Sequence, residues 1–261
     1  MEFFLLLLII GLLVGILGTI IGAGGGFILV PILLILFPEK IPEEITSISL
    51  AVVFFNSISG TFAYHKMKRI DYKSGLFFAV STVPGAILGT LVITLISKNI
   101  FNLTFGIILL ILATYLFLKP ENKNNMKKSI TETETHTKTH KKWLGVFINL
   151  TIGFISTLLG IGGGIMRVPA LVHLLNFPVH MATATSHFIV AIMAFSSSIV
   201  HLINGNYENN LIPVITLSIA AIVGAQIGAR LSTKVKGSII IRILALTLSL
   251  IGLRMIFKTF F

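Results

Sequence analysis

The 261-residue sequence contains no cysteine and little charge. Without cysteine it can form no disulfide, no thiolate metal site and no cysteine nucleophile. Only 11% of its residues are Asp, Glu, Lys or Arg, whereas soluble domains carry about 25%. This shortage of charged residues argues against a soluble globular domain.

Long apolar runs take the place of charge. Apolar residues make up 55% of the chain, and its mean hydropathy is +0.99. About 20 consecutive apolar residues are enough to cross a membrane as a helix, so the runs predict an all-α, polytopic membrane protein. Uncharged runs occupy residues 3–38, 45–65, 74–97, 100–118, 143–166, 181–203 and 211–229.

The net charge of +11 comes from basic residues near the ends of these runs. Four lie in the loop 66–73, and seven lysines lie in the connection 119–142. Membrane proteins keep such residues on the cytoplasmic side, so we interpret them as orientation signals and expect no nucleic-acid partner. The N-terminus lacks a basic region and a cleavage site, which favours a first membrane segment over a removable signal.

Two segments of the chain repeat each other at an offset of 138 residues. Residues 22–31 read GAGGGFILVP, and residues 160–169 read GIGGGIMRVP. Ser49 matches Ser186, and PGAILG at 84–89 matches VGAQIG at 223–228. The order of these blocks predicts a duplication with repeats at 1–118 and 143–261. The polar tract between them, 119–142, is predicted to be a disordered linker.

Each repeat begins with one overlong apolar segment, 3–37 or 143–177, and continues with three ordinary ones. A glycine run interrupts each overlong segment, and glycine leaves helical geometry readily. Pro31 and Pro169 suit the first turns of a new helix. We therefore expect a broken, re-entrant helix in each repeat, with the second part beginning near residue 28 or 166.

The basic residues barely separate two topologies. Inverted repeats put 14 Lys and Arg on the cytoplasmic side against 4 outside, and parallel repeats put 13 against 5. The loop 205–210 contains no basic residue and suits the outside, which favours inversion. The predicted fold is therefore two inverted repeats, each with one re-entrant helix and three transmembrane helices.

The glycine breaks are the predicted substrate site. Irregular backbone at membrane depth persists where it is buried in protein or lines an aqueous cavity. The N-termini of the helices after the breaks offer unpaired N–H donors and partial positive charge, which suit an anion. Close helix packing through small residues is the alternative explanation. The predicted binding residues at the breaks are Gly24, Gly25, Gly26, Phe27, Gly162, Gly163, Gly164 and Ile165.

Arg167 is the charged residue to which we give most weight. It follows the second break, and no acidic residue lies between positions 143 and 207. An arginine at mid-membrane costs about 2.5–3.5 kcal/mol, and it opposes the helix dipole. A bound anion would offset both costs, while snorkelling to the interface or pairing with carbonyl groups is the alternative. The corresponding residue of the first repeat is Leu29, so the site is expected to be asymmetric.

His187 and Asn56 are the remaining candidates. His187 is expected to line the cavity beside Arg167 and to contact the substrate or carry a proton, the alternative being an ordinary hydrogen-bonded histidine. Asn56 belongs to a polar stripe that also contains Ser57, Ser59 and Thr61. We predict no metal site and no cofactor, because no cluster of ligands with suitable geometry is recognisable.

The doubled G-x-G-G-G-x-x-x-V-P element and the later P-G-A-x-x-G stretch resemble the TauE/SafE family of sulfite and sulfonate exporters. The resemblance covers nearly the whole chain apart from 119–142. It implies a multi-pass protein of the prokaryotic inner membrane that moves sulfite, sulfonates or similar anions. It carries over to the glycines and prolines of both elements, but not to Arg167, and Thr46-Ser47-Ile48-Ser49 departs from the family's Gly-Thr-Ser element.

Residues and resemblance together predict a secondary transporter that works by alternating access. An anion channel and, less favoured, a membrane-embedded enzyme are the alternatives. The expected partners are a small anion and the lipid bilayer, and a homo-oligomer is compatible with the sequence. No catalytic residue is assigned, since no nucleophile with a base is recognisable.

Overall fold

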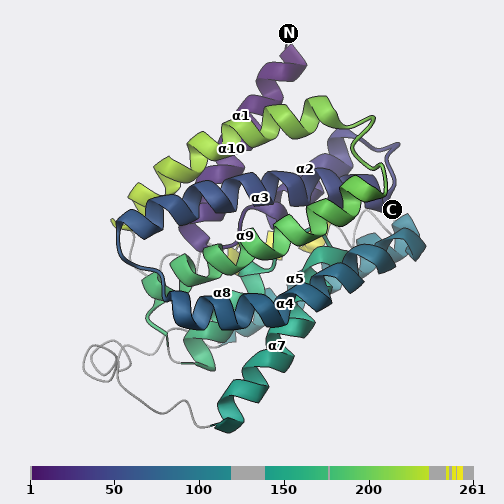
Figure 1. The fold of residues 1–261 in the computed structure, drawn as a ribbon. Helices are drawn as coiled ribbons and strands as arrows, with labels where there is room; N and C mark the ends of the chain where they lie inside the picture. The colour runs from purple at the N-terminus through teal and green to yellow at the C-terminus, as the bar shows by residue number, and fades with distance from the viewer. Residues whose placement is uncertain are drawn as a thin grey trace.

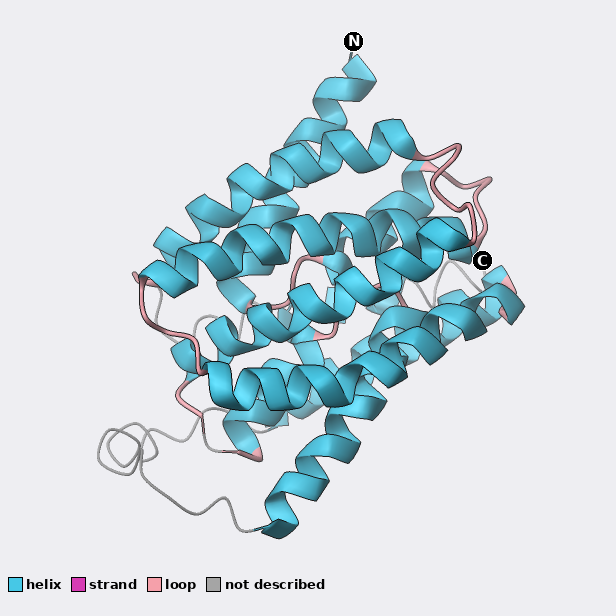
Figure 2. Cartoon of the chain, viewed as in Figure 1, coloured by secondary structure: helices cyan, strands magenta, loops and turns pink. Residues whose placement is uncertain are grey.

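A computed structural model describes residues 2–118, 139–175 and 177–234, with short pieces at 245–246, 249–250 and 252–254. Every regular element in these ranges is a helix, which confirms the all-α prediction (Figures 1 and 2). In chain order the elements are α1 (Glu2–Ile21), α2 (Gly26–Leu36), α3 (Pro42–Lys66), α4 (Tyr72–Val92), the 3-10 helix η1 (Ile93–Leu95), α5 (Lys98–Leu118), α7 (Thr139–Leu158), α8 (Gly164–His173), α9 (Val179–Ile203) and α10 (Leu211–Ser232).

Six helices in the described ranges are long and apolar enough to cross a membrane. They are α1, α3, α4 with η1, α5, α9 and α10. Large apolar side chains stay exposed on their outer faces, for example Val80 at 67% and Ile212 at 71%. Such surfaces suit lipid and not water, so the chain is a multi-pass membrane protein.

Both overlong segments are broken at their glycines, as the sequence predicts. The second helices begin at Gly26 and Gly164, two residues earlier than expected. The residues before them, Gly25 and Gly163, have φ values of 88° and 76°. Only glycine adopts this left-handed region without strain, which explains why the helix ends at these positions.

Each broken segment turns back to the side from which it starts. The ring of Phe37, just after α2, lies edge-on to Phe3 at the start of α1, with 5.8 Å between ring centroids. In the second broken segment, His173 ends α8, and its ring lies 6.0 Å from that of Tyr115 near the end of α5. α1 with α2 therefore forms one hairpin, and α8 leads back toward the start of α9.

The first helix of each predicted repeat packs against a later helix of the other, α1 against α10 and α7 against α4. Gly11 of α1 faces Leu217 of α10, and Gly228 of α10 faces Ile16 of α1. Contacts that advance together along both helices mean that α1 and α10 run in the same direction.

The equivalent pair, α4 and α7, packs in the same way. A Cβ atom at Gly85 would lie 2.1 Å from the Leu150 carbonyl oxygen, and one at Gly89 would lie 2.2 Å from that of Phe154. These two helices also run parallel to each other and approach backbone to backbone. Small residues permit this close approach in membranes.

The helices α3 and α9 cross the middle of the molecule side by side in opposite directions (Figure 1). Phe54 contacts Phe195 at 5.3 Å between centroids, whereas Tyr64, ten residues later, contacts His187 at 6.0 Å. Since the duplication pairs α3 with α9, these contacts support an inverted arrangement. The repeat boundaries remain a prediction. Residues 119–138 lie outside the described residues, and α7 begins within the range predicted as linker.

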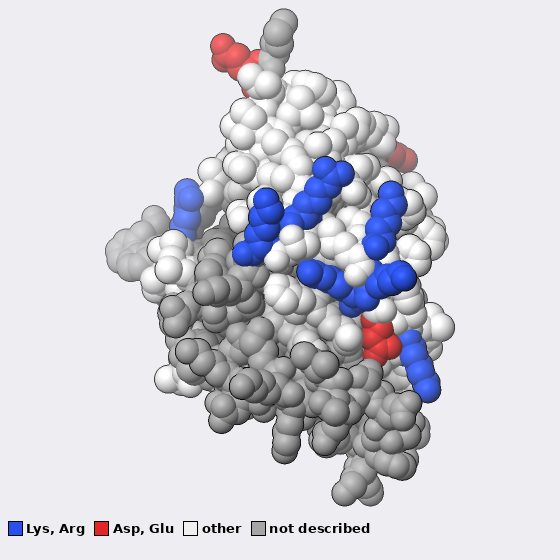
Figure 3. All heavy atoms as spheres, turned by 90° about the vertical axis from the view of Figure 1, so that its left-hand side faces the viewer, with Lys and Arg blue, Asp and Glu red and all other residues white. Residues whose placement is uncertain are grey.

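One face of the molecule gathers basic side chains, as Figure 3 shows. α3 and α10 end on this face and α4 begins there (Figure 1). The positive-inside rule assigns this face to the cytoplasm. The described basic residues of these ends are Lys66, Lys68, Arg69, Lys73, Arg230 and Lys234.

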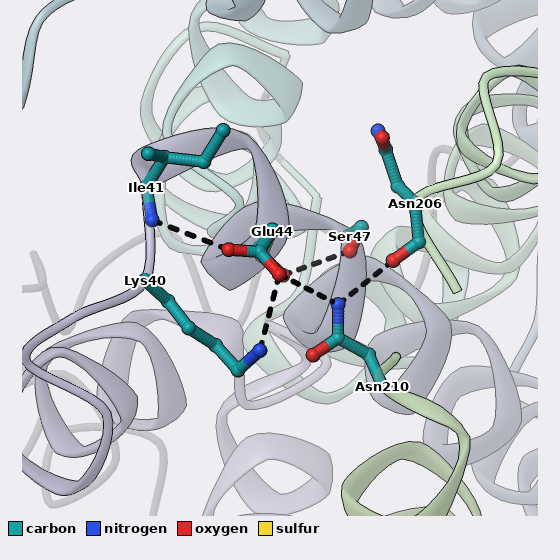
Figure 4. Close-up of polar contacts among 6 residues, drawn as sticks. All are labelled: Lys40, Ile41, Glu44, Ser47, Asn206 and Asn210. Carbon is teal, nitrogen blue, oxygen red and sulfur yellow. Dashed lines mark hydrogen bonds and ion pairs between the residues drawn. The ribbon is translucent and has the colours of Figure 1, made fainter. Parts of the chain in front are cut away.

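The opposite end is closed by polar contacts between the start of α3 and the α9–α10 loop (Figure 4). The Asn210 side-chain amide donates to the Glu44 carboxylate at 3.3 Å, and Lys40 forms an ion pair with the same carboxylate at 3.1 Å. The Asn206 amide donates to Glu43 at 2.7 Å. These contacts join residues more than 160 positions apart and hold the two parts of the chain together.

Candidate functional site

The two glycine loops meet each other inside the protein. A Cβ atom on Gly164 would lie 2.2 Å from the Gly22 carbonyl oxygen and 2.3 Å from the Ala23 Cα atom. A Cβ atom on Gly26 would lie 2.5 Å from the Gly160 carbonyl oxygen. Backbone therefore touches backbone at both points, and no larger residue fits.

Serines from the central helices hold the loops in matching positions. The Ser49 hydroxyl of α3 donates to the Gly160 carbonyl at 2.7 Å, and the Ser186 hydroxyl of α9 donates to the Gly22 carbonyl at 2.9 Å. These two serines are the pair that the duplication equates. The Asn56 amide adds a third bond, to the Gly24 carbonyl at 2.9 Å.

Several amide groups of the loops are left as donors. The N–H groups of Gly25, Gly26 and Phe27 find no acceptor among the described residues, and those from Gly162 to Ile165 find none either. The N–H groups of Gly24 and Ile28 are not free, because they donate to the carbonyls of Gly18 and Gly25. Free donors therefore occur at the start of both short helices, as at any helix N-terminus.

Arg167 is fully enclosed, with 1% of its surface exposed. Its Nε donates to the Asn149 side-chain oxygen at 3.1 Å, and one terminal nitrogen approaches the Thr82 hydroxyl at 3.3 Å. The other terminal nitrogen, Nη1, has no hydrogen-bond partner in the part of the chain that the structure describes. The one salt bridge among the described residues joins Lys40 to Glu44, so no carboxylate there neutralises Arg167. The snorkelling alternative does not hold, because the side chain stays buried.

The start of α8 lies beside the Arg167 head group. Met193 links the two, because its sulfur is 3.9 Å from the arginine Nη2 and 3.4 Å from the place of a Cβ atom on Gly163. The Ser156 hydroxyl is 2.9 Å from the same place and is buried without a partner. The Ser156 hydroxyl thus lies at the N-terminus of α8, and Met193 lies between that N-terminus and the guanidinium. We call Arg167, Ser156, Met193, Asn149 and Thr82 the arginine cluster.

His187 and Asn56 belong to a second group of polar residues. The Thr19 hydroxyl donates to the Asn56 side-chain oxygen at 3.2 Å and lies 3.4 Å from the His187 Nε2. The Tyr64 hydroxyl donates to the Thr19 carbonyl at 2.7 Å. We call Thr19, Asn56, Tyr64 and His187 the histidine cluster. Within the described residues, no hydrogen bond or ring contact joins it to Arg167.

The sequence comparisons agree with this architecture. The model of the family described as sulfite exporter TauE/SafE matches residues 7–255. The chain belongs to the TauE/SafE family.

Relatives of this TauE/SafE chain match it from end to end. The probable membrane transporter protein YunE of Bacillus subtilis is 35% identical over 272 residues, covering 99% of each chain. A probable membrane transporter protein of Methanocaldococcus jannaschii is 31% identical, covering 98% of this chain and 97% of its own. No solved structure matches. The family and these relatives identify the chain as a membrane transporter protein and confirm the resemblance.

Sequence reasoning found part of the TauE/SafE chain's polar interior. It identified Arg167 and the glycine loops, but it expected His187 to line a cavity beside Arg167, and these two residues belong to separate clusters. Asn149 and Ser156 were missed although they are seven residues apart, which puts them on one face of α7. Thr82 was missed because it lies in another helix, α4. Leu29, the counterpart of Arg167 in the first repeat, is a fully buried apolar residue.

Proposed function

We propose that this chain is a secondary transporter for small sulfur-containing anions, such as sulfite and sulfonates. The anion would bind between the Arg167 guanidinium and the N-terminus of α8. The observation that carries the proposal is a fully buried arginine that lacks a carboxylate partner and has a free Nη1 nitrogen.

The energetics favour an anion over a merely structural role. A buried arginine costs about 2.5–3.5 kcal/mol at mid-membrane even on the lenient insertion scale. Asn149 and Thr82 supply only neutral acceptors. The positive end of the α8 dipole adds to the local positive potential. An anion between them would offset both contributions.

The donor set fits the oxygens of a sulfonate or sulfite. A guanidinium binds two oxygens of such a group with two parallel hydrogen bonds, a geometry that an ammonium group does not provide. The Ser156 hydroxyl and the first N–H groups of α8 offer further donors for a remaining oxygen. At Arg167 the two bonds would come from the free Nη1 and from Nη2, which would exchange its contact with the Met193 sulfur for an anion oxygen.

Alternating access is the mechanism that the helix directions favour. Two hairpins that enter from opposite sides and meet at their glycine loops resemble the broken helices of inverted-repeat transporters. In such proteins one half rocks against the other around a fixed central site. An anion channel remains the second candidate, because the same donors could hold an anion weakly at several positions.

Counterflow in proteoliposomes separates the two candidates. The purified protein is reconstituted with an excess of unlabelled sulfite or isethionate inside, and labelled anion is added outside. A carrier accumulates label transiently above equilibrium, whereas a channel lets it equilibrate without an overshoot. Sulfate, acetate and chloride serve as competitors, and a failure of every sulfur oxyanion to exchange would refute the proposed function.

A further inference from the structure

The histidine cluster surrounds an imidazole that has hydrogen-bonding groups on both sides. His187 is completely buried, and its Nε2 faces the Thr19 hydroxyl at 3.4 Å. Backbone groups of Gly22 and Asn56 also lie near the ring. Nδ1 has no hydrogen-bond partner among the described residues. A neutral imidazole has one N–H group, and an imidazolium has two. The backbone carbonyls of Gly22 and Asn56 could accept a hydrogen bond from the second N–H group, which only the imidazolium has.

The fit around the ring is tight. A Cβ atom on Gly60 of α3 would lie 2.4 Å from the His187 Nε2 and 2.5 Å from its Cδ2. The helix therefore needs glycine at position 60 so that the imidazole can reach Thr19. Gly60 therefore leaves room for the imidazole ring beside α3. A histidine that only fills space would not need this room.

Few other groups near the ring can titrate. From α1 the ring faces Thr19, and from α3 it faces Asn56, Gly60 and the edge of Tyr64. A phenol titrates near pH 10, far above the working range of a cell. Among these side chains, His187 is thus the one whose residue type has an ordinary pKa near neutral pH.

The charged groups on neighbouring elements lie at the cytoplasmic end. The α4 N-cap residue Asp71 donates its backbone N–H to the Thr185 hydroxyl at 3.1 Å, two residues before His187 along α9. Arg69, in the same loop, interacts electrostatically with Tyr64 and His180. Every described Asp or Glu lies in a loop or a terminal turn, so no carboxylate of these ranges can carry a proton through the centre.

We propose that His187 binds the coupling proton, so that one H⁺ crosses the membrane with each anion in the same direction. The inference rests on the proposed function. On one side Nδ1 takes up a proton from water, and on the other side it returns the proton to water, so no other bond changes. The charge of the anion is balanced during the crossing, which lowers the cost of moving it through the membrane.

A chain of contacts connects the proton to the anion. An imidazolium Nδ1–H would be drawn to the Gly22 or Asn56 carbonyl, and the Gly22 carbonyl already accepts the Ser186 hydroxyl. The same carbonyl touches the second loop at Gly164. Arg167 lies three residues after Gly164, and its backbone N–H donates to the Gly163 carbonyl at 3.0 Å. Protonation of His187 on α9 therefore acts through the Gly22 carbonyl on the loop that precedes α8.

Isethionate is the probe of choice for the test. Its sulfonate group stays ionised across the pH range of the assay, so any response to pH belongs to the protein. Proteoliposomes with the interior at pH 7.5 are diluted into buffer at pH 6.5, and the membrane potential is clamped at zero with valinomycin and equal potassium. One proton per anion predicts accumulation of up to about tenfold, because one pH unit is a tenfold proton gradient.

The variant His187→Gln separates coupling from transport. We expect it to keep counterflow within about twofold of the wild type and to lose accumulation driven by the pH gradient. His201→Gln is the matched control, because His201 is a fully buried histidine on the same helix. It lies near the outer end of α9, where its Nδ1 contacts the Asn206 amide at 2.9 Å. It should keep both activities. If His187→Gln does not reach the membrane, the smaller His187→Asn replaces it.

The outcomes are distinct. Absence of isethionate counterflow in the wild type would refute transport of this sulfonate, and the coupling proposal with it. Normal counterflow without any response to the pH gradient would refute coupling and leave the proposed function intact. Accumulation that persists in His187→Gln, or loss of its counterflow together with accumulation, would show that the histidine does not carry the coupling proton.

Discussion

Replacement of Arg167 by methionine tests the anion site most directly. Methionine is unbranched and comparable in length, so Arg167→Met removes the charge without leaving a large cavity. The change relieves about 2.5–3.5 kcal/mol of burial cost and removes a charged hydrogen bond to Asn149, worth about 1.5–3 kcal/mol. The two contributions nearly cancel.

The neutral partners of Arg167 keep their other hydrogen bonds in this variant, and the Asn149 side-chain oxygen loses its donor. The Asn149 amide keeps its bond to the Gly145 carbonyl at 2.8 Å, and the Thr82 hydroxyl keeps its bond to the Phe78 carbonyl at 2.7 Å. The anion-free protein should therefore unfold within a few degrees of the wild type. Anion affinity should fall roughly tenfold to a hundredfold, the loss of one charge-assisted contact.

Leu29→Met is the matched control at the corresponding position of the other short helix. Leu29 is fully buried, and a volume-conserving exchange costs less than about 1.5 kcal/mol, so affinity should be unchanged. Arg167→Lys should keep the charge and lose most of the affinity, because ammonium cannot form the two-pronged contact. The assay is isethionate or sulfite binding by calorimetry at constant ionic strength. Unchanged affinity in Arg167→Met would refute the arginine site.

Three further predictions concern the loops and the topology. Gly164→Ala should destabilise the protein by about 3 kcal/mol or more, because the new Cβ atom would clash with Gly22. The control is Gly205→Ala, on an exposed loop where the nearest atom would be 3.7 Å away, and it should cost about 1–2 kcal/mol. Equal shifts of the unfolding temperature in the two variants would contradict this prediction. In intact cells an impermeant maleimide should label Asn209→Cys but not Lys73→Cys, and the reverse pattern would invert the orientation. Glu43→Ala should speed hydrogen exchange in the α9–α10 loop about tenfold, because it removes the hydrogen bond to Asn206. The control Glu39→Ala should leave the exchange rates unchanged. Equal exchange rates in the two variants would show that the Glu43–Asn206 contact does not restrain the loop.

The glycine elements made much of this fold predictable, because their signals are local. A run such as Gly24-Gly25-Gly26 followed by Pro31 specifies both the end of one helix and the start of the next. A lone arginine in an apolar segment likewise identifies an interior charge before any partner is known. Each of these signals lies within about ten residues of sequence.

The partners of Arg167 could not be predicted in the same way. Thr82 lies 85 positions away, on α4, and its neighbours do not differ from other polar residues of membrane helices. Its position beside the arginine follows from the backbone contact between Gly85 and Leu150, which depends on how α4 packs on α7. Long-range helix pairing of this kind is not encoded in local periodicity.

The pairing of α1 with α10 also has a consequence for how the protein is made. Gly15 contacts Gly224, so 209 residues separate two helices that pack backbone to backbone. At about 5–20 residues per second, the ribosome needs roughly 10–40 s to supply α10 after α1 has emerged. During that time the glycine face of α1 has only lipid or the membrane insertion machinery to contact. The nascent chain must therefore keep its first helix in the bilayer, unpaired, until almost all of the protein has been synthesised.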